Sequence, residues 1–334
     1  MRSCTVVGIG ELLWDVFPAR RRLGGAPVNF TCHCRQLGAR GVPVSCIGED
    51  ADGRDILEAV SALGLEVDYI QRHPSAPTGT VQVVLDLQRK PHYEIKEQVA
   101  WDFIRPAAAL LRLAPAVDAV CFGSLAQRSG ISRATIRRFV SSCPAAALRI
   151  FDVNLRQAFY TKAVIAKSLG AANVLKVGDE ELPVLAAMFG LRGSVTDQIR
   201  RLIEDFELRL AAYTRGENGS LLVTADEVVD HPGCKTEAVD TVGAGDSYTA
   251  ALCMGLLRQR PLEEVIQHAT EVSAFVCSHP GATPILPDEL VKAMSGGSSP
   301  SGRPGFTGSE PPAASGSARA GRRIDTQRVR KYLE

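Results

Sequence analysis

A glycine-rich turn that leads directly into a helix is the strongest chemical pattern in this sequence. In DTVGAGDSYTAALCMGLL, the residues Gly243, Ala244 and Gly245 carry little side chain, and the apolar periodicity of a helix follows them. The free amides and the dipole of a helix N-terminus bind anions, and small residues let a phosphate reach those amides. Asp246 would lie beside that phosphate, where a carboxylate repels the ligand. This placement favours a base that takes a proton from an attacking hydroxyl, and an ordinary helix-start residue is the alternative.

Another glycine turn stands near the start of the chain, in LGGAPVNFTCHCRQLG; because it comes earlier along the chain we call it the first glycine turn, and the turn at 243–245 the second. Gly24 and Gly25 permit a sharp bend ahead of a helix that we expect to begin near Pro27, a favoured first-turn residue. Asn29 would then lie in the first part of that helix, where its amide can offer both a donor and an acceptor to a polyol. A plain strand-to-helix turn explains the same residues without a ligand.

An acidic residue follows the first apolar segment, in GIGELLWD. We expect Asp15 to lie at the carboxyl edge of a sheet, where its carboxylate could accept hydrogen bonds from two vicinal hydroxyls; a surface turn is the alternative. Gly8 and Gly10 lack the third glycine of GxGxxG, which disfavours a Rossmann dehydrogenase. The sequence has no GxxxxGK[ST] motif either, which disfavours a P-loop kinase.

The elements that must position these residues alternate along the chain, and strand patterns that are apolar throughout are followed by amphipathic helix patterns. This alternation predicts an α/β fold with a mostly parallel sheet that is covered by helices on both faces. Right-handed crossovers would place the ligand loops at the carboxyl ends of the strands. The patterns indicate strands over 4–9, 42–48, 119–124, 148–154, 173–177 and 209–214, and helices over 51–64, 132–143, 179–190 and 243–259.

One segment, TGTVQVVLDLQRKPHYEI, departs from this alternation. Its valines and threonines alternate, which predicts an antiparallel hairpin outside the main sheet, with a turn around Gln88 to Pro91. Together with the first glycine turn it would form a small β lid over about 12–30 and 78–98. Such a lid could close over a ligand, and a plain edge hairpin is the alternative.

Charge and cysteine content limit the partners and the compartment. Lys and Arg total 38 against 37 Asp and Glu, so the net charge of +1 predicts no nucleic-acid partner. No apolar stretch is long enough to cross a bilayer, so we expect no membrane partner. The nine cysteines are scattered and form no CxxC pair, which is typical of a reducing compartment and predicts a cytoplasmic protein.

The composition changes abruptly after Met294, where SGGSSPSGRPGFTGSEPPAASGSARAGRR follows. A run of Gly, Ser, Pro and Ala cannot bury enough apolar surface to offset the entropy of ordering it. We therefore predict one folded domain over 1–294 and a disordered tail over 295–334, with a short helical patch near RVRKYLE.

Two signatures together resemble those of the PfkB (ribokinase-like) carbohydrate kinase family: GGAPVNFTCHCRQLGARGVPVSCIG near the N-terminus and DTVGAGDSY near the C-terminus. GELLWD, TGTVQV, FGSLAQRS, FDVNLR and YTRGENGS agree, and the resemblance runs from about Cys4 to Met294. It is similar to the fructokinase-type branch. The resemblance implies a ribokinase-like fold with a β lid, a kinase that uses ATP and Mg²⁺, and fructose as the acceptor. Ribose, 2-keto-3-deoxygluconate or a nucleoside remain alternative acceptors, and a homodimer through the lid is a further implication.

The resemblance also implies roles for individual residues. Asp246 would be the catalytic base, and the amides of Gly243, Ala244 and Gly245 would stabilise charge on the γ-phosphoryl group. Sugar hydroxyls would be bound by Asp15, Gly25 and Asn29, while Asn154 and Arg156 would face the cleft. Arg156 would reach a phosphate oxygen, and a solvent-exposed loop arginine is the equal alternative.

The nucleotide and cation positions follow in the same way. Thr214 and Gly216 would line the nucleotide cleft with Gly281 nearby, and Asp240 and Val242 would hold a monovalent cation such as K⁺. The family pattern NxxE, which organises Mg²⁺ through water, appears here in LKVGDEEL. Glu181 is kept, but Gly178 replaces the asparagine, although the adjacent Asp179 could compensate. This departure leaves open a catalytically impaired sugar-binding protein.

Overall fold

The molecule, seen in this computed structural model, is built on one long, mostly parallel sheet; the structure describes residues 3–18, 20–85, 91–293 and 332. The strands from β11 to β5 are parallel, and β12 and β13 continue the sheet antiparallel at one edge. In spatial order the strands are β13 (Val228–His231), β12 (Ser220–Val223), β11 (Leu210–Thr214), β10 (Val174–Gly178), β9 (Leu148–Asp152), β8 (Ala119–Phe122), β1 (Thr5–Ile9), β4 (Arg40–Gly48) and β5 (Ile70–His73).

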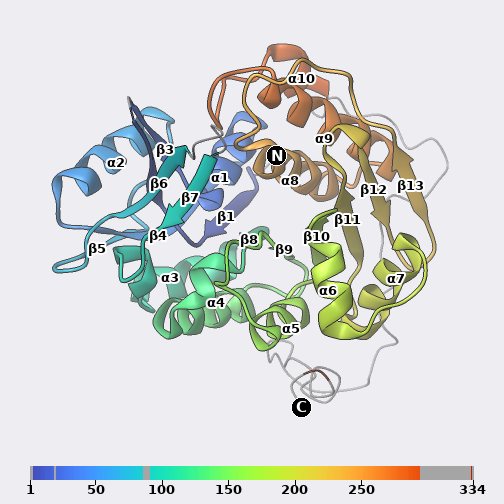
Figure 1. Cartoon of the computed structure of the whole chain (residues 1–334), viewed down its shortest axis with the longest axis horizontal. Coiled ribbons are helices and arrows are strands. Elements are labelled where there is room, and N and C mark those ends of the chain that lie inside the picture. Colours follow the sequence, from blue (N-terminus) through green and yellow to red (C-terminus); the bar gives the residue numbers. More distant parts are fainter. Residues whose placement is uncertain (1–2, 19, 86–90, 294–331, 333–334) are drawn as a thin grey trace.

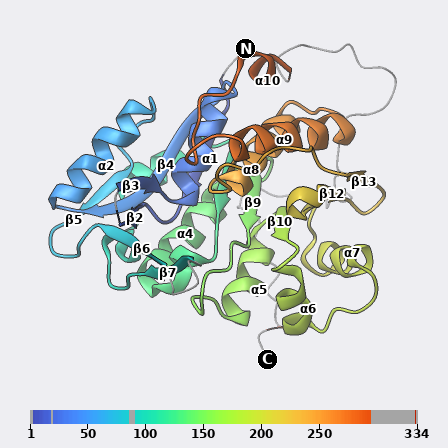
Figure 2. The same ribbon diagram turned by 45° about the horizontal axis from the view of Figure 1, so that its top comes forward.

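Helices cover both faces of this sheet, as Figures 1 and 2 show. The strands β1, β8 and β9 are buried at every position, which explains why their sequences are mostly apolar rather than alternating. One face carries α1 (Ala26–Gln36), α2 (Ala51–Ala62), α8 (Ala244–Leu257), α9 (Leu262–Cys277) and α10 (Asp288–Ala293). The other face carries α3 (Ala108–Leu113), α4 (Gly130–Ser142), α5 (Lys162–Ala171), α6 (Leu182–Phe189) and α7 (Val195–Phe206). The predicted fold class is confirmed.

A second, smaller sheet lies beside the first, with the strand order β3-β2-β6-β7. It consists of β3 (Arg20–Gly24), β2 (Leu13–Phe17), β6 (Gly79–Leu85) and β7 (Pro91–Ile95). β6 and β7 pair antiparallel, so the predicted hairpin is confirmed, and most of its predicted turn lies outside the described residues. Residues 26–30, which we included in the lid, belong to α1 in the main body.

Almost all of the segment that we predicted to be a disordered tail, residues 295–334, lies outside the described residues. Tyr332 is described, and its ring stacks on Phe206 with centroids 5.4 Å apart. It also meets Phe189 edge-on, and its hydroxyl donates a hydrogen bond to Asp205. Among the described helices, none combines the length and the apolar character needed to span a bilayer.

Candidate active site

The second glycine turn forms the N-terminus of α8, which begins at Ala244 with Gly243 as its N-cap. Gly243 has φ +81°, and a Cβ there would lie 2.6 Å from the carbonyl oxygen of Ala282. Only glycine can therefore bring this turn against the Ala282 backbone. The buried His33 on α1 contacts the same carbonyl at 2.9 Å, and this contact holds the Ala282 backbone in place behind the turn. The first-turn amides of α8 have no intrahelical acceptors and can bind an anion.

Asp246 lies in the first turn of α8 and is half-buried. Its Oδ2 accepts a hydrogen bond of 2.9 Å from Asn29 Nδ2, so the structure brings together two residues that are 217 positions apart. Burial raises the pKa of the Asp246 carboxyl, although the hydrogen bond from Asn29 and the charges of Lys176 and Arg156 oppose the shift. A carboxylate that is held in place and made more basic is suited to accept a proton.

The first glycine turn places Asn29 and closes around Glu11. Gly25 has φ +118°, and a Cβ there would clash with the carbonyl oxygen of Glu11. Helix α1 begins one residue later, at Ala26, as the sequence predicted. The Asn29 amide donates to the Gly25 carbonyl at 3.2 Å, which starts the helix with Asn29 buried and facing Asp246.

Asp15 lies in a different place from the one that we predicted. Strand β1 ends at Ile9, and Asp15 stands in the middle of β2 in the small sheet, opposite Arg22 in register. Burial raises the pKa of Asp15 to about 6, although the charges of Arg156 and Arg22 oppose the shift. The acid that follows β1 is Glu11, which we did not single out. It is buried, burial raises its pKa, and it lines a narrow crevice with Asp246.

Asp152 and Thr249 line this crevice and Lys176 lies next to Asp152, three polar residues that the sequence analysis did not single out. Lys176 Nζ lies 3.1 Å from Asp152 Oδ1, and Thr249 Oγ1 donates to Asp152 Oδ2 at 3.3 Å. A Cβ at Gly245 would lie 3.2 Å from Lys176 Nζ, so the ammonium group sits against the turn. Burial raises the pKa of Asp152 to about 6, despite the charge of Lys176. The sequence signal that could have identified these residues is a charged residue near the end of an otherwise apolar strand.

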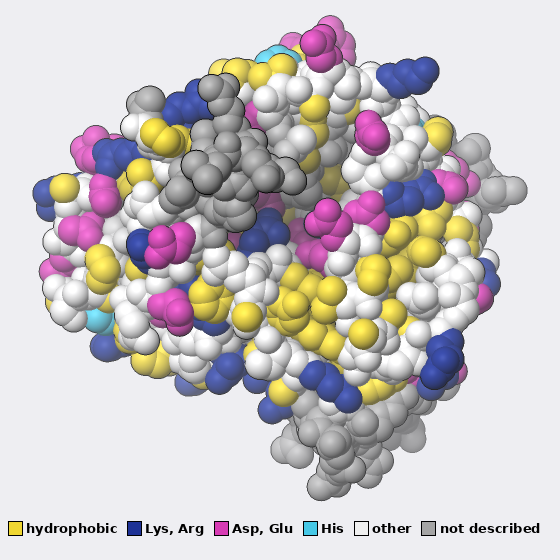
Figure 3. All heavy atoms as spheres, viewed as in Figure 1, with side chains coloured by type: hydrophobic (Ala, Val, Ile, Leu, Met, Phe, Trp, Pro, Cys, Tyr) yellow, Lys and Arg dark blue, Asp and Glu magenta, His cyan; other side chains and the backbone are white. Residues whose placement is uncertain are grey.

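The loop after β9 contributes the next two predicted residues. Asn154 has φ +42°, its carbonyl accepts a hydrogen bond of 3.2 Å from Ser124 Oγ, and it lines the crevice. Arg156 is exposed, yet its charge opposes the rise that burial causes in the pKa values of Glu11, Asp15 and Asp246. Figure 3 shows acidic and basic side chains gathered in a hollow at the centre of one face.

Gly178, which replaces the asparagine of the NxxE pattern, lies directly beside Glu181. Glu181 Oε2 accepts from the Gly178 amide at 2.7 Å, and its Oε1 accepts from the Leu155 amide at 2.9 Å. A Cβ at Gly178 would meet Glu181 Oε2 at 3.4 Å, an ordinary contact. No group of three or more His, Cys, Asp or Glu in the described ranges could hold a metal ion directly. A Mg²⁺ ion beside Glu181 would then take most of its ligands from phosphate oxygens and water.

The residues predicted to bind nucleotide lie at and after the end of β11 and close to the turn that precedes α8. Thr214 ends β11 beside Gly178, and its carbonyl accepts from the Asp179 amide at 2.9 Å. Gly216 follows with φ +55°, in a short 3₁₀ turn over Gly216–Asn218. The amide of Gly281 donates to Asp240 Oδ2 at 3.1 Å, which joins this predicted nucleotide residue to a predicted cation residue.

Both carboxylate oxygens of Asp240, a predicted cation ligand, already accept hydrogen bonds. Asp240 Oδ1 accepts from the Val242 amide at 3.1 Å, and Oδ2 accepts from both Gly281 and the guanidinium of Arg22. Burial acts to raise the pKa of Asp240, but these hydrogen bonds and the charge of Arg22 outweigh it and lower the pKa. A monovalent cation at this carboxylate would compete with a guanidinium that is already bound.

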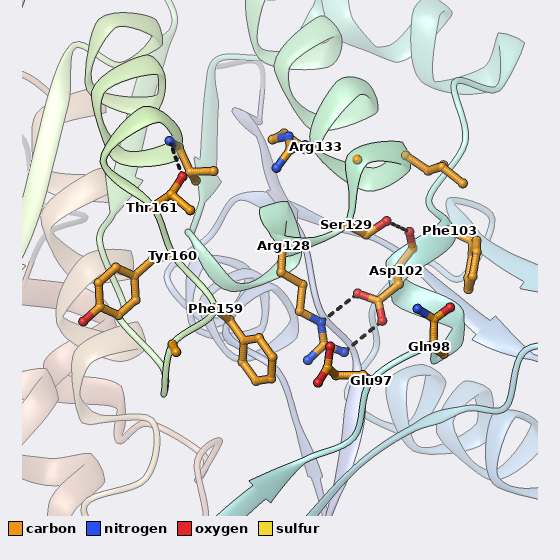
Figure 4. A pocket seen from close by; sticks show the side chains of 14 residues that line it. Glu97, Gln98, Asp102, Phe103, Arg128, Ser129, Arg133, Phe159, Tyr160 and Thr161 are labelled. Atoms are coloured by element: carbon orange, nitrogen blue, oxygen red, sulfur yellow. Dashed lines mark hydrogen bonds and ion pairs between the residues drawn. The ribbon is translucent and has the colours of Figure 1, made fainter. Parts of the chain in front are cut away.

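A larger cavity of about 630 Å³ opens beside the small sheet and the loops after β8 and β9 (Figure 4). Arg128 forms a double ion pair with Asp102 in its wall and stacks between Trp101 and Phe159, at 3.9 and 4.6 Å from their ring centroids. None of the residues predicted to be functional lines this cavity. Two of the predicted residues, Asp246 and Asn154, instead line the crevice between α1, α8 and the ends of β1, β8 and β9.

Comparison with known proteins decides the family. The sequence profile described as pfkB family carbohydrate kinase matches residues 9–289, which is most of the chain. The chain belongs to the PfkB family of carbohydrate kinases. The resemblance drawn from the two glycine motifs is thereby confirmed, and this PfkB protein is a sugar kinase.

Several relatives span almost the whole PfkB domain. The sugar kinase PH1459 of Pyrococcus horikoshii is 27% identical over 319 residues, which cover 86% of this chain and 94% of the relative. Its crystal structure with ATP has a TM-score of 0.73 at 26% identity, covering 83% of this chain and 94% of that one. Fructokinase-1 of Oryza sativa subsp. japonica is 26% identical over 315 residues, covering 86% and 96%.

A fructokinase double mutant from Vibrio cholerae O395, solved with fructose, ADP and a potassium ion, has a TM-score of 0.73. It is 23% identical and covers 87% of this PfkB chain and 98% of that chain, so it supports the fold alone.

Proposed function

We propose that this PfkB kinase transfers the γ-phosphoryl group of ATP directly to a hydroxymethyl group of a small sugar, with fructose as the acceptor. The observation that carries the proposal is the hydrogen bond between Asp246, in the first turn of α8, and Asn29 on α1. A partly buried carboxylate of raised pKa beside an anion-binding turn suits a base in phosphoryl transfer. A protein that only binds sugar has no need for a base there.

The residues divide the work between the two substrates. Asp15 and Asn29 bind and orient the sugar, so that one hydroxyl lies against Asp246. The hydroxyl gives its proton to Asp246 as its oxygen attacks the γ-phosphorus in line with the leaving ADP oxygen. The free amides at the start of α8 stabilise the charge on the transferring group. No covalent phosphoenzyme is required, because the two substrates meet directly.

Charged groups around the crevice support this transfer. Lys176 lies against Gly245, and the charges of Lys176 and Arg156 both act on Asp246, so both would add positive potential where the phosphoryl group would be. Glu181 would hold Mg²⁺ through water, and bound Mg²⁺ would neutralise phosphate charge. Thr214, Gly216 and Gly281 would line the nucleotide cleft. The small sheet would close over the sugar and exclude water, and it could also pair with a second copy.

Fructose is the proposed acceptor because of the likeness to fructokinases, which is at low identity. The other acceptors are ribose, 2-keto-3-deoxygluconate and nucleosides. A catalytically impaired sugar-binding protein is the second candidate function, and Gly178 in place of asparagine is the observation that favours it.

The test is the release of ADP from Mg·ATP in the presence of fructose, ribose, 2-keto-3-deoxygluconate, tagatose or adenosine in turn. We expect turnover above background with fructose and little with the others. Turnover with another acceptor would keep the kinase and reassign its substrate. Sugar binding without turnover for every acceptor would favour the impaired protein, and Gly178→Asn should then restore activity.

A further inference from the structure

One ion pair joins the small sheet to the loop that precedes α8. Arg22 on β3 bonds Asp240 through its guanidinium, although the two residues are 218 positions apart. Their side chains are 22% and 16% exposed, so the pair is largely shielded from water. β3 and the start of α8 belong to different layers of the molecule (Figure 1). The pair is therefore a tertiary contact between two elements and does not arise from closeness in the sequence.

The carboxylate of Asp240 organises both sides of the anion-binding turn. One oxygen holds the amide of Val242, which directly precedes Gly243, and the other holds the amide of Gly281. Gly281 in turn precedes Ala282, whose backbone packs against Gly243. A shielded carboxylate that holds two backbone segments needs a positive charge nearby, because an unpaired charge is costly away from water.

Arg22 supplies that charge. It lies opposite Asp15 in the register of β2 and β3, where its charge opposes the rise that burial causes in the pKa of Asp15, and it helps to lower the pKa of Asp240. The neighbouring Arg21 points elsewhere, to Asp52 and Asp55 near the start of α2. Arg22 is thus the arginine of this strand that reaches the Asp240 loop.

We propose that Arg22 is a built-in cation for the Asp240 loop, and that this kinase therefore binds nucleotide without a monovalent cation. Arg22 acts as a positioning residue: through Asp240 it holds Val242 and Gly281, and so the turn that receives the phosphates. The proposal rests on the proposed function, since it assumes that nucleotide binds at this turn. It replaces the expectation that Asp240 and Val242 hold K⁺.

The test compares nucleotide binding in two salts of equal ionic strength, tetramethylammonium chloride and potassium chloride. Binding is measured by titration calorimetry with Mg·ADP and by the rise in Tm that Mg·ADP causes. We expect the wild type to bind equally in both salts. Arg22→Met should bind about tenfold more weakly in tetramethylammonium, since it lacks a charge-assisted hydrogen bond. Potassium should restore most of that affinity by occupying the site that the guanidinium leaves.

Two variants control the interpretation. Arg20→Met removes the same charge from the same face of β3, where Arg20 contacts Phe17, and it should behave like the wild type in both salts. Arg22→Lys keeps a cation and should remain independent of potassium. The Tm of each protein without nucleotide shows whether it is folded.

Several outcomes would overturn the proposal. One is a wild type that needs potassium to bind Mg·ADP, and another is an Arg22→Met variant that binds as tightly as the wild type in tetramethylammonium. The other two are a loss of Mg·ADP affinity in Arg22→Met that potassium does not restore, and an equal loss of affinity in Arg20→Met. If the wild type binds Mg·ADP in neither salt, the proposed function fails together with this inference. Binding that appears only in potassium removes this inference alone.

Discussion

Replacement of Lys176 by methionine should change both the stability and the pH profile of the enzyme. Its ammonium group lies 3.1 Å from Asp152 Oδ1, and the two side chains are 11% and 7% exposed. At that separation, two unit charges attract by about 5 kcal/mol in a medium of effective dielectric constant about 20. The variant leaves Asp152 buried without its cation. Loss of one partner from a buried pair lowers the free energy of unfolding by about 3–5 kcal/mol.

The pH effect follows from the charge of Lys176 on Asp246. Asp246 must be ionised to accept a proton, so kcat/KM should fall as the pH falls through its pKa. The charge of Lys176 lowers this pKa. Without that charge, the acidic limb of the kcat/KM profile should move to higher pH. The assay is ADP release with fructose over a range of pH, at temperatures where thermal unfolding shows the variant to be folded.

A double variant separates folding from catalysis. Lys176→Met with Asp152→Asn removes both charges, so it should recover most of the lost stability. Its acidic limb should move less than that of the single variant, because a negative charge near Asp246 is removed too. An acidic limb that stays at the wild-type pH in a folded Lys176→Met protein would refute the reasoning.

Two glycines give further predictions. Gly243→Ala should lower both Tm and kcat/KM, because a left-handed backbone costs a non-glycine residue about 1–2 kcal/mol and the new Cβ would press on Ala282 at 2.6 Å; unchanged values would show that the turn can relax. Gly178→Asn should lower the Mg²⁺ concentration needed for half-maximal rate without loss of Tm, since its Cβ would make an ordinary 3.4 Å contact with Glu181. A magnesium titration checks this, and a higher requirement would contradict it.

The fold could be predicted because buried parallel strands leave a strong trace in the sequence. The strand patterns over 4–9 and 119–124, for example, correspond to β1 (Thr5–Ile9) and β8 (Ala119–Phe122). The glycine turns could be located for a similar reason: each combines small residues with the start of a helix. The proximity of Asp246 and Asn29 was implicit in the resemblance to the PfkB family, which covers both motifs.

The remaining parts of the site depend on tertiary contacts that no local pattern records. The position predicted for Asp15 was wrong because β2 begins only four positions after β1 ends. The sequence GELLWD therefore resembled the end of a single strand rather than the start of a second one. Asp152 and Lys176 face each other across neighbouring strands, and a charged residue in an apolar segment does not reveal its partner. Arg22 was one of three consecutive arginines, and only the structure shows which of them reaches Asp240.

The measurement that tests the central claim most directly is the turnover of Asp246→Asn with Mg·ATP and fructose, next to its affinity for fructose. An amide at this position keeps the shape of the side chain and can still accept the hydrogen bond from Asn29, but it cannot take a proton. We predict that fructose binding changes only a few-fold while kcat falls by about 10²–10⁴. Full turnover in Asp246→Asn would contradict the account.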